Sequence, residues 1–293
     1  MSDSAGTVAV VGASGFLGSA LSAELAARGT PTAQFTRKSP VSRAGGPLQR
    51  DLARAETIYW MASSINPLVA ENDRSRVEYD ADTLRSTLEA LRDLGSTARF
   101  VLLSSGGTVY DPLCPPPYAE HSPVAPVGAY GRAKHALEQI VSGLRPGSTI
   151  VRVANAYGAG QPLAPGQGVL GHWLRALRAG RPIQLFGPAS TARDYVHIRD
   201  ITSALLALHL LPDVPAVVNV GSGRATTLGE LVDVLRQVVG DVQVEQLAAR
   251  GFDVERTWLD ISVARRTLDW EPQVGLVEGI NDMWEWVTAD PMR

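Results

Sequence analysis

A phenol and an ammonium group lie four residues apart at Tyr130 and Lys134. Residues with this spacing share one face of a helix, so the two side chains lie side by side if the segment is helical. A cation beside a tyrosine stabilises its phenolate and eases proton exchange near neutral pH. The pair therefore predicts a tyrosine that transfers a proton. Lys134 could also hold the ribose of a nicotinamide cofactor.

Lysine is scarce in this chain, because Lys38 and Lys134 are its only two among 27 lysines and arginines. A tyrosine and a lysine at this spacing are therefore a rare coincidence. The alternative is a solvated helix face without chemistry, which the surrounding motifs disfavour.

The first predicted strand-to-helix junction is rich in glycine. An apolar run at residues 7–11 leads into a G-x-x-G-x-x-G segment and then a helical pattern at residues 19–28. Glycines three apart let the backbone turn sharply and approach a pyrophosphate, which then lies at the helix N-terminus. A purely structural turn is the alternative. The residues expected to contact the cofactor here are Gly12, Ser14, Gly15, Phe16, Leu17 and Gly18.

The end of the second predicted strand bears on which dinucleotide is bound. An acid there would accept hydrogen bonds from the adenosine ribose, whereas arginine accommodates a 2′-phosphate. This chain has Arg37 and Lys38 and no nearby acid. NADP(H) is therefore preferred and NAD remains possible, with a solvated basic turn as the alternative. Asp51 and Leu52 are candidates to meet the adenine ring.

Strand-like and helix-like segments alternate through the first half of the chain. Strands are expected at residues 7–11, 32–36, 57–62, 99–104 and 148–153, and helices at 19–28, 77–94 and 130–144. This alternation predicts an α/β fold, a doubly wound parallel Rossmann sheet covered on both faces. We expect a dinucleotide-binding domain over 1–154, to which 196–220 returns, and a smaller α/β substrate-binding lobe over 155–293.

Composition excludes several classes of function. Among 293 residues, 45% are hydrophobic, and the formal charge is −3. This balance favours neither nucleic acid nor an anionic membrane as a partner. Cys114 is the only cysteine and the five histidines show no ligand spacing, so no metal site is expected. The N-terminus lacks a basic region typical of signal peptides, and a cytoplasmic location is expected.

Together these motifs resemble the extended short-chain dehydrogenase/reductases, and within them the NAD-dependent epimerase/dehydratase family of nucleotide-sugar epimerases, dehydratases and ketoreductases. The resemblance covers nearly the whole chain. It rests on the glycine loop, the Tyr130/Lys134 pair and further segments that match the family's patterns, at residues 59–62, 103–110, 152–158, 186–187, 193–197, 256–260 and 268–272.

The resemblance implies further site residues. It places Ala62 against the cofactor and Asn155 against the phosphates of a nucleotide sugar. It also pairs Arg193 and Arg256 with the diphosphate, which suits a guanidinium that donates two parallel hydrogen bonds. Surface ion pairs are the alternative for both arginines. The resemblance further implies a homodimer formed through the helices at 77–94 and 130–144.

The chain departs from the family at the third catalytic residue. A serine or threonine usually lies four residues before the tyrosine of the V-Y-G segment, where this chain has Gly106. The hydroxyl must then come from Ser105 or Thr108, of which we prefer Thr108. Dehydratases of this type carry an Asp-Glu pair where this chain has Gly107 and Thr108, so a dehydratase is disfavoured.

Three functions follow, in order of preference. The basic corner at Arg37 and Lys38 favours an NADPH-dependent reductase of the 4-keto group of a dTDP-type deoxysugar. An NAD-dependent nucleotide-sugar 4-epimerase is the second hypothesis. A non-catalytic NADP(H)-binding sensor or scaffold is the third, but such a protein would not need Tyr130 with Lys134.

Overall fold

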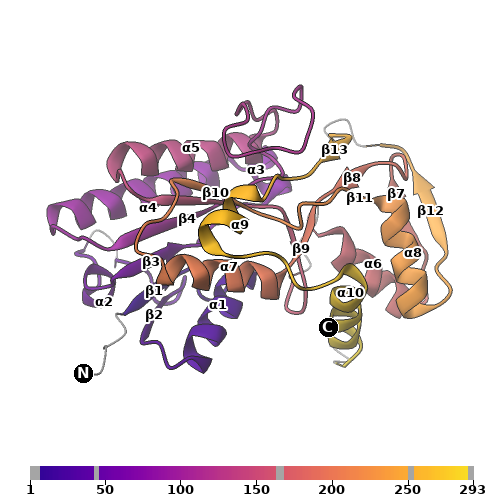
Figure 1. Ribbon diagram of the computed structural model, residues 1–293, viewed down its shortest axis with the longest axis horizontal. Helices are drawn as coiled ribbons and strands as arrows, with labels where there is room; N and C mark the ends of the chain where they lie inside the picture. The colour runs from indigo at the N-terminus through magenta and orange to yellow at the C-terminus, as the bar shows by residue number, and fades with distance from the viewer. Residues whose placement is uncertain (1–6, 43–45, 163–167, 250–253, 290–293) are drawn as a thin grey trace.

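The computed structural model describes residues 7–42, 46–162, 168–249 and 254–289. A six-stranded parallel sheet with the strand order β10-β5-β4-β3-β1-β2 runs through its centre (Figure 1). Its strands are β1 (Val8–Val11), β2 (Thr32–Phe35), β3 (Thr57–Trp60), β4 (Arg99–Ser105), β5 (Thr149–Val153) and β10 (Val217–Val220).

Strand order reverses at β1. The chain passes from β1 outward to β2 and then returns to the other side of β1 with β3. At such a switch point the connections diverge from the carboxyl ends of two neighbouring strands, which opens a crevice for ligands. The glycine segment follows β1, and Ala62 follows β3, so the expected cofactor residues meet at this crevice.

Alternation along the strands divides the apolar residues between the two faces of the sheet. Val8 and Val10 of β1 belong to one hydrophobic core, whereas Ala9 and Val11 belong to the other. Helices α1 (Phe16–Ala27) and α7 (Ile198–Leu210) cover the first face. Helices α4 (Arg74–Asp93) and α5 (Ala129–Leu144) cover the second (Figure 1). The doubly wound α/β fold is therefore confirmed.

A third core lies at the other end of the molecule, under three helices and a two-stranded sheet (Figure 1). These elements are α6 (Val169–Arg178), α8 (Leu228–Val239), α10 (Leu276–Ala289), β7 (Ile183–Phe186) and β12 (Val244–Leu247). The fully buried side chains of Leu174, Leu231 and Met283 help to fill this core. The domain boundary expected after residue 154 remains a prediction.

Short elements connect the sheet to this third core. Parallel pairing joins β6 (Asn155–Tyr157) to β9 (Tyr195–His197). A three-stranded sheet has the order β11-β8-β13. Its strands are β8 (Ala192–Arg193), β11 (Thr226–Thr227) and β13 (Arg256–Thr257), and the remaining helices are α2 (Arg50–Ala53), α3 (Pro67–Asn72) and α9 (Ser262–Leu268).

Two expected helices begin earlier than their apolar spacing suggests. Helix α1 starts at Phe16, directly after Gly15, so the glycine segment is itself the helix start. Helix α4 starts at Arg74, where the Asp73 side chain accepts a hydrogen bond from the backbone N–H of Arg76.

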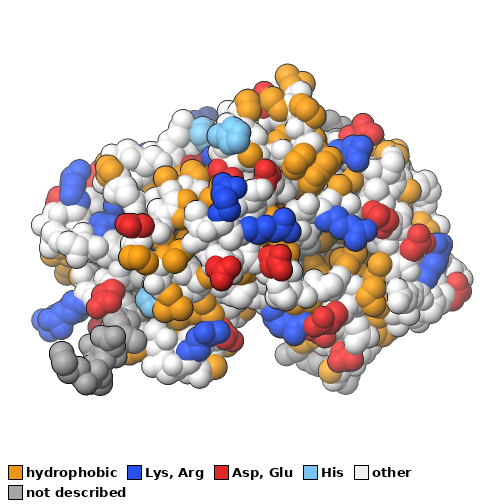
Figure 2. Space-filling model, in the orientation of Figure 1, with side chains coloured by type: hydrophobic (Ala, Val, Ile, Leu, Met, Phe, Trp, Pro, Cys, Tyr) orange, Lys and Arg blue, Asp and Glu red, His pale blue; other side chains and the backbone are white. Residues whose placement is uncertain are grey.

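In the part of the chain that the structure describes, none of the helices is both long and apolar enough to span a membrane. Acidic and basic side chains are interspersed on the face that Figure 2 shows.

Candidate functional site

The glycine junction brings β1, β3 and α1 into close contact. Gly12 has a φ of +96°, and a Cβ on it would lie 2.7 Å from the backbone nitrogen of Ala62. A Cβ on Gly18 would lie 2.2 Å from the Gly12 carbonyl oxygen. Both positions therefore require glycine. Gly15 is the N-cap of α1 and supplies no side-chain cap, which leaves the N–H groups of the first turn available to an anion.

This junction fits the pyrophosphate of a dinucleotide. Helix α1 has no acidic residue in its first turn that would repel an anion. Ser14 and Gly15 are exposed, whereas Phe16 and Leu17 are half-buried beside them. The geometry is that of an open helix N-terminus at the switch point of the sheet, as the sequence predicts for cofactor binding.

The basic corner lies in a tight turn after β2. The Thr36 hydroxyl accepts hydrogen bonds from the backbone N–H groups of Lys38 and Ser39, each at 3.2 Å. Arg37 and Lys38 are both exposed, and neither forms an ion pair with any residue that the structure describes. Their cationic groups are therefore available to a phosphate.

The two candidate adenine contacts differ in exposure. Asp51 is exposed in the first turn of α2. Leu52 is fully buried in the hydrophobic core. Of the two, Asp51 presents its side chain to solvent in the free protein.

A buried carboxylate that the motifs did not single out holds the loop after β3. Asp80 of α4 accepts hydrogen bonds from the Ser63 hydroxyl at 3.1 Å and from the Ser64 backbone N–H at 2.9 Å. This loop begins at Ala62, whose backbone contacts Gly12. The carboxylate of Asp80 therefore fixes the loop after β3 to α4.

Tyr130 and Lys134 lie on the first two turns of α5, as their spacing predicts. The Lys134 ammonium nitrogen lies 5.6 Å from the centroid of the Tyr130 ring. Lys134 is only 7% exposed, and its ammonium group has no hydrogen bond or ion pair with any described residue. An ammonium without a partner in the protein can donate to a ligand, so a ligand with oxygen acceptors would stabilise it. Ribose hydroxyls are such acceptors, and the residues fit a bound nicotinamide nucleotide.

Close packing places helix α5 against the loop after β4. A Cβ on Gly131 would lie 2.2 Å from the Thr108 carbonyl oxygen, so only glycine permits this approach. The contact brings Thr108 beside Tyr130, and both line the same cavity. The Thr108 hydroxyl is buried without a hydrogen-bond partner among the described residues. Ser105 ends β4, is half-buried and does not line the cavity.

A buried ion pair fixes α5 to the sheet. The Arg152 guanidinium of β5 donates to both carboxylate oxygens of Glu138, at 3.1 and 2.7 Å. The Ser104 hydroxyl of β4 donates to the same carboxylate. Glu138 lies one turn beyond Lys134, so this contact fixes the helix face that carries Tyr130 and Lys134. Sequence patterns pointed to the segment of Arg152 but not to this pairing, because the partners lie 14 residues apart on different elements.

The predicted substrate residues gather near the carboxyl end of β5. Asn155 donates through Nδ2 to the Asp194 carbonyl at 3.0 Å and lies beside Gly107. Arg193 and Arg256 lie on the neighbouring strands β8 and β13. Arg193 donates to the carbonyl of Glu255, and the guanidinium of Arg256 stacks on Trp258 at 5.3 Å. The Arg256 side chain is exposed. Thr257, the next residue along the chain, lines the cavity.

Asp194 is a second carboxylate that the motifs did not assign. It is almost fully buried and accepts hydrogen bonds from the backbone N–H groups of Ser222, Gly223 and Leu259. Burial raises the pKa of this carboxyl group. Its bonds join β8 to the loop after β10 and to the segment after β13. Asp194 therefore positions the strands that carry Arg193 and Arg256.

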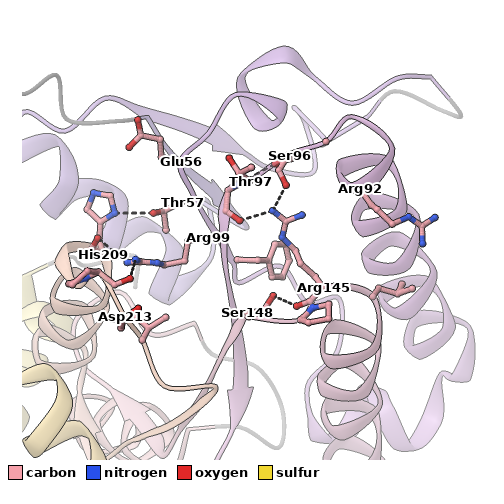
Figure 3. A pocket seen from close by; sticks show the side chains of 18 residues that line it. Glu56, Thr57, Arg92, Ser96, Thr97, Arg99, Arg145, Ser148, His209 and Asp213 are labelled. Carbon is pink, nitrogen blue, oxygen red and sulfur yellow. Dashed lines mark hydrogen bonds between the residues drawn. The ribbon is translucent and has the colours of Figure 1, made fainter.

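The cavity beside Tyr130 has a volume of about 590 Å³. A larger cavity of about 870 Å³ lies at the opposite, amino-terminal edge of the sheet. There the side chains of Arg99 and Arg145 already have partners (Figure 3). Arg99 donates to the carbonyls of Leu208, His209 and Pro212, and Arg145 donates to those of Ser96 and Ala98. The larger cavity is therefore a region where arginines complete hydrogen bonding at helix and loop ends.

No group of three or more His, Cys, Asp or Glu side chains that could hold a metal ion occurs within the described ranges. The groups at and beside the smaller cavity suit acid–base chemistry, because the Tyr130 phenol and the unpaired Thr108 hydroxyl line it and the Lys134 ammonium lies near the phenol. Such groups can position a hydroxyl or carbonyl oxygen and transfer a proton to or from it.

Known proteins with similar sequences match about two thirds or more of the chain. The chain is 32% identical to dTDP-6-deoxy-L-talose 4-dehydrogenase (NAD(P)(+)) of Kitasatospora kifunensis, over 97% of this chain and 96% of that protein. It is 34% identical to UDP-glucose 4-epimerase of Mycolicibacterium smegmatis, over 66% of this chain and 63% of that protein.

The fold is shared with a solved structure of UDP-glucose 4-epimerase from Thermotoga maritima with UDP-glucose. The TM-score is 0.84 at 24% identity, covering 96% of this chain and 98% of that one. The sequence model of the NAD dependent epimerase/dehydratase family matches residues 8–221, from β1 to the loop after β10. The chain belongs to the NAD-dependent epimerase/dehydratase family.

Proposed function

We propose that this protein is an oxidoreductase that interconverts a 4-keto group and a 4-hydroxyl group on a dTDP-linked 6-deoxyhexose. One observation carries the proposal: Tyr130 and the unpaired Thr108 hydroxyl line one cavity, and the Lys134 ammonium lies 5.6 Å from the centroid of the Tyr130 ring. The nearly full-length similarity to a dTDP-6-deoxy-L-talose 4-dehydrogenase supports the sugar class and the reacting carbon.

Each side chain has a defined part in the reaction. The bound nicotinamide supplies hydride to the sugar C4 in reduction and accepts it in oxidation. Tyr130 donates a proton to O4 in reduction and takes it back in oxidation. Lys134 stabilises the phenolate that remains and holds the ribose of the cofactor. Thr108 donates a hydrogen bond to O4, where negative charge develops as the carbonyl is reduced.

NADP(H) is the proposed cofactor, with NAD possible. Support comes from Arg37 and Lys38, whose exposed cationic groups have no ion-pair partner among the described residues. Arginine at this corner accommodates a 2′-phosphate. The diphosphate of the substrate would meet Asn155, Arg193 and Arg256. A homodimer through α4 and α5 and a cytoplasmic location stay predictions from sequence.

Nucleotide-sugar 4-epimerisation is the second candidate, because a UDP-glucose 4-epimerase is 34% identical over two thirds of the chain. It would use the same tyrosine and lysine but would retain its cofactor through the whole cycle. Reduction is favoured because an exposed NADP(H) corner suits a cofactor that exchanges at each turnover. A non-catalytic sensor is disfavoured by the paired Tyr130 and Lys134.

An oxidation assay tests the proposal. Purified protein is mixed with dTDP-6-deoxy-L-talose and either NADP⁺ or NAD⁺, and formation of reduced cofactor is followed by absorbance. We expect stoichiometric formation of NADPH and of a 4-keto product. Formation of the C4 epimer without net cofactor reduction would instead support the epimerase. Binding of NADP⁺ without turnover of this sugar or of UDP-glucose would contradict both enzymes.

A further inference from the structure

The cavity beside Tyr130 has an apolar wall. Its described lining includes Pro67 and Leu68 at the start of α3, Val127 before α5, and Val254. Leu68 is 48% exposed and Val127 is 60% exposed, which makes them two of the large hydrophobic side chains that solvent reaches. Exposed apolar residues scattered singly are ordinary, but these two border one cavity beside the candidate proton donor.

Several polar groups in the lining already have partners. The Glu71 carboxylate accepts a hydrogen bond from the Ala129 backbone N–H at 2.8 Å. Asn72 donates through Nδ2 to the Leu68 carbonyl at 2.7 Å. The Tyr110 hydroxyl donates to the Asn219 side chain at 2.7 Å. Two lining hydroxyls, those of Thr108 and Tyr118, have no partner among the described residues. Neither belongs to α3, so a sugar hydroxyl facing Leu68 would find few unused partners on that helix.

The apolar character continues above the cavity. Pro112 lines the cavity and belongs to the loop that follows Tyr110. This loop rises above α3 and β13 at the top of the view in Figure 1. In Figure 2, hydrophobic side chains gather on the same projection. Leu113 there is 91% exposed. The mouth of the cavity thus offers a surface suited to a methyl group rather than to a hydroxymethyl group.

We infer that Leu68 and Val127 determine sugar specificity by contacting the C5 methyl group of a 6-deoxyhexose. The inference rests on the proposed function, which places the sugar C4 beside Tyr130. Carbon C5 is bonded directly to C4, so its substituent lies next to the reacting centre and within reach of the adjoining wall. A methyl group there covers both side chains. A hydroxymethyl group would bury a hydroxyl against them without a partner.

The size of this selectivity follows from the chemistry of the wall. An apolar pocket rejects a ligand that merely adds a hydroxyl group by about 100-fold at most. We therefore expect the kcat/KM for dTDP-6-deoxy-L-talose to exceed that for dTDP-L-talose by about 10- to 100-fold. Both sugars carry the same reacting centre, so the ratio isolates the contact at C6.

The test is this ratio in wild-type protein and in a Leu68→Asn, Val127→Thr double variant, whose side chains keep similar volumes. We expect the double variant to lower the ratio about tenfold, chiefly by raising KM for the 6-deoxy sugar. Leu210→Asn is the control, because Leu210 is 75% exposed at the end of α7 and lies outside the cavity. Its ratio should equal that of the wild type. Melting temperature and NADPH affinity should be unchanged in both variants.

The outcomes separate this inference from the proposed function. If the wild type oxidises dTDP-6-deoxy-L-talose and the double variant keeps the wild-type ratio, the inference is overturned and the proposed function stands. Equal turnover of both sugars by the wild type would also overturn the inference alone. If the wild type oxidises neither sugar, both the proposed function and the inference are overturned.

Discussion

The two cavities at opposite edges of the central sheet differ in what their polar groups already do. At the amino-terminal edge, Arg99 and Arg145 donate to backbone carbonyls, and the Thr57 hydroxyl and the His209 ring lie within hydrogen-bond distance at 3.1 Å. At the carboxyl edge, the Lys134 ammonium and the Thr108 hydroxyl have no partner among the described residues. The smaller cavity therefore borders the edge of the sheet that has unused hydrogen-bonding groups.

Helix direction explains this difference. In a parallel α/β fold, helices end near the amino-terminal edge of the sheet and present carbonyl groups there. Arg99 donates hydrogen bonds to two backbone carbonyls at the end of α7. The polar side chains of that cavity therefore complete the hydrogen bonding of the fold. Helices α1 and α5 begin at the carboxyl edge and present N–H groups that favour anions. The comparison teaches that cavity volume is a poorer guide to function than unused hydrogen-bonding groups.

The largest expected effect is at the proton donor. Tyr130→Phe removes the hydroxyl but keeps the ring, so we expect kcat to fall about 1,000-fold, within the range for a general acid. NADPH affinity should change little. The assay is steady-state turnover of dTDP-6-deoxy-L-talose, and Tyr79→Phe on the exposed face of α4 is the matched control. Wild-type kcat in Tyr130→Phe would show that the carboxyl-edge cavity is not the site.

Next in size is the loss of the unpaired hydroxyl. Thr108→Val keeps the side-chain shape, and we expect kcat/KM to fall about 10- to 100-fold because a donor to the developing charge on O4 is lost. The thermal midpoint should not fall, because the Thr108 hydroxyl has no partner in the free protein. Ser105→Ala is the control and should stay near wild type. A larger loss in Ser105→Ala would reverse our preference.

A smaller effect concerns the choice of cofactor. Replacing Arg37 and Lys38 by alanine removes two cations near the expected 2′-phosphate. We expect the ratio of NADPH to NADH affinity to fall about 10- to 100-fold, since a hydrogen bond to a charged group contributes about 1.5–3 kcal/mol. Fluorescence titration with both cofactors gives the ratio. Arg28→Ala, which removes a surface arginine paired with Glu24, should leave it unchanged. An unchanged ratio in the double variant would mean that this turn is only a solvated surface.

The smallest effect on activity is expected at the larger cavity. Arg99→Ala should lower the free energy of unfolding by about 1–3 kcal/mol, because three carbonyls lose a charged donor. The activity of the folded protein should equal that of the wild type. Denaturant titration and kcat/KM measure the two quantities. Arg92→Ala is the control, since this exposed arginine forms a surface ion pair with Asp93 and should change stability by less than about 0.5 kcal/mol. If Arg99→Ala lost activity while it stayed folded, the conclusion that the larger cavity has only a structural role would be wrong.

Local sequence motifs predicted most of the residues that the structure places at the carboxyl edge of the sheet. The glycine segment, the corner at Arg37 and the Tyr130/Lys134 pair are each contiguous or four residues apart, so their spacing constrains geometry directly. The preference for Thr108 over Ser105 agrees with the lining of the cavity, although the catalytic role itself stays a prediction. The doubly wound sheet followed from the alternation of apolar strands and amphipathic helices.

Contacts between distant segments could not be predicted in the same way. Asp80 reaches the loop at Ser63 across 17 residues, and Asp194 reaches Leu259 across 65. A buried acid looks like a surface acid in sequence until its donors are known. The same holds for the apolar wall, because Leu68 and Val127 have no shared motif and line one cavity only when α3 packs beside the start of α5.

Transfer of deuterium from cofactor to sugar tests the central claim most directly. The protein is supplied with NADPH that carries deuterium at the transferred position and with the 4-keto form of dTDP-6-deoxy-L-talose. Mass spectrometry and NMR then locate the label in the product. A reductase that exchanges its cofactor places one deuteron at C4 of each product molecule, and this is the result we predict. A product formed without deuterium at C4 would contradict reduction by NADPH at this site.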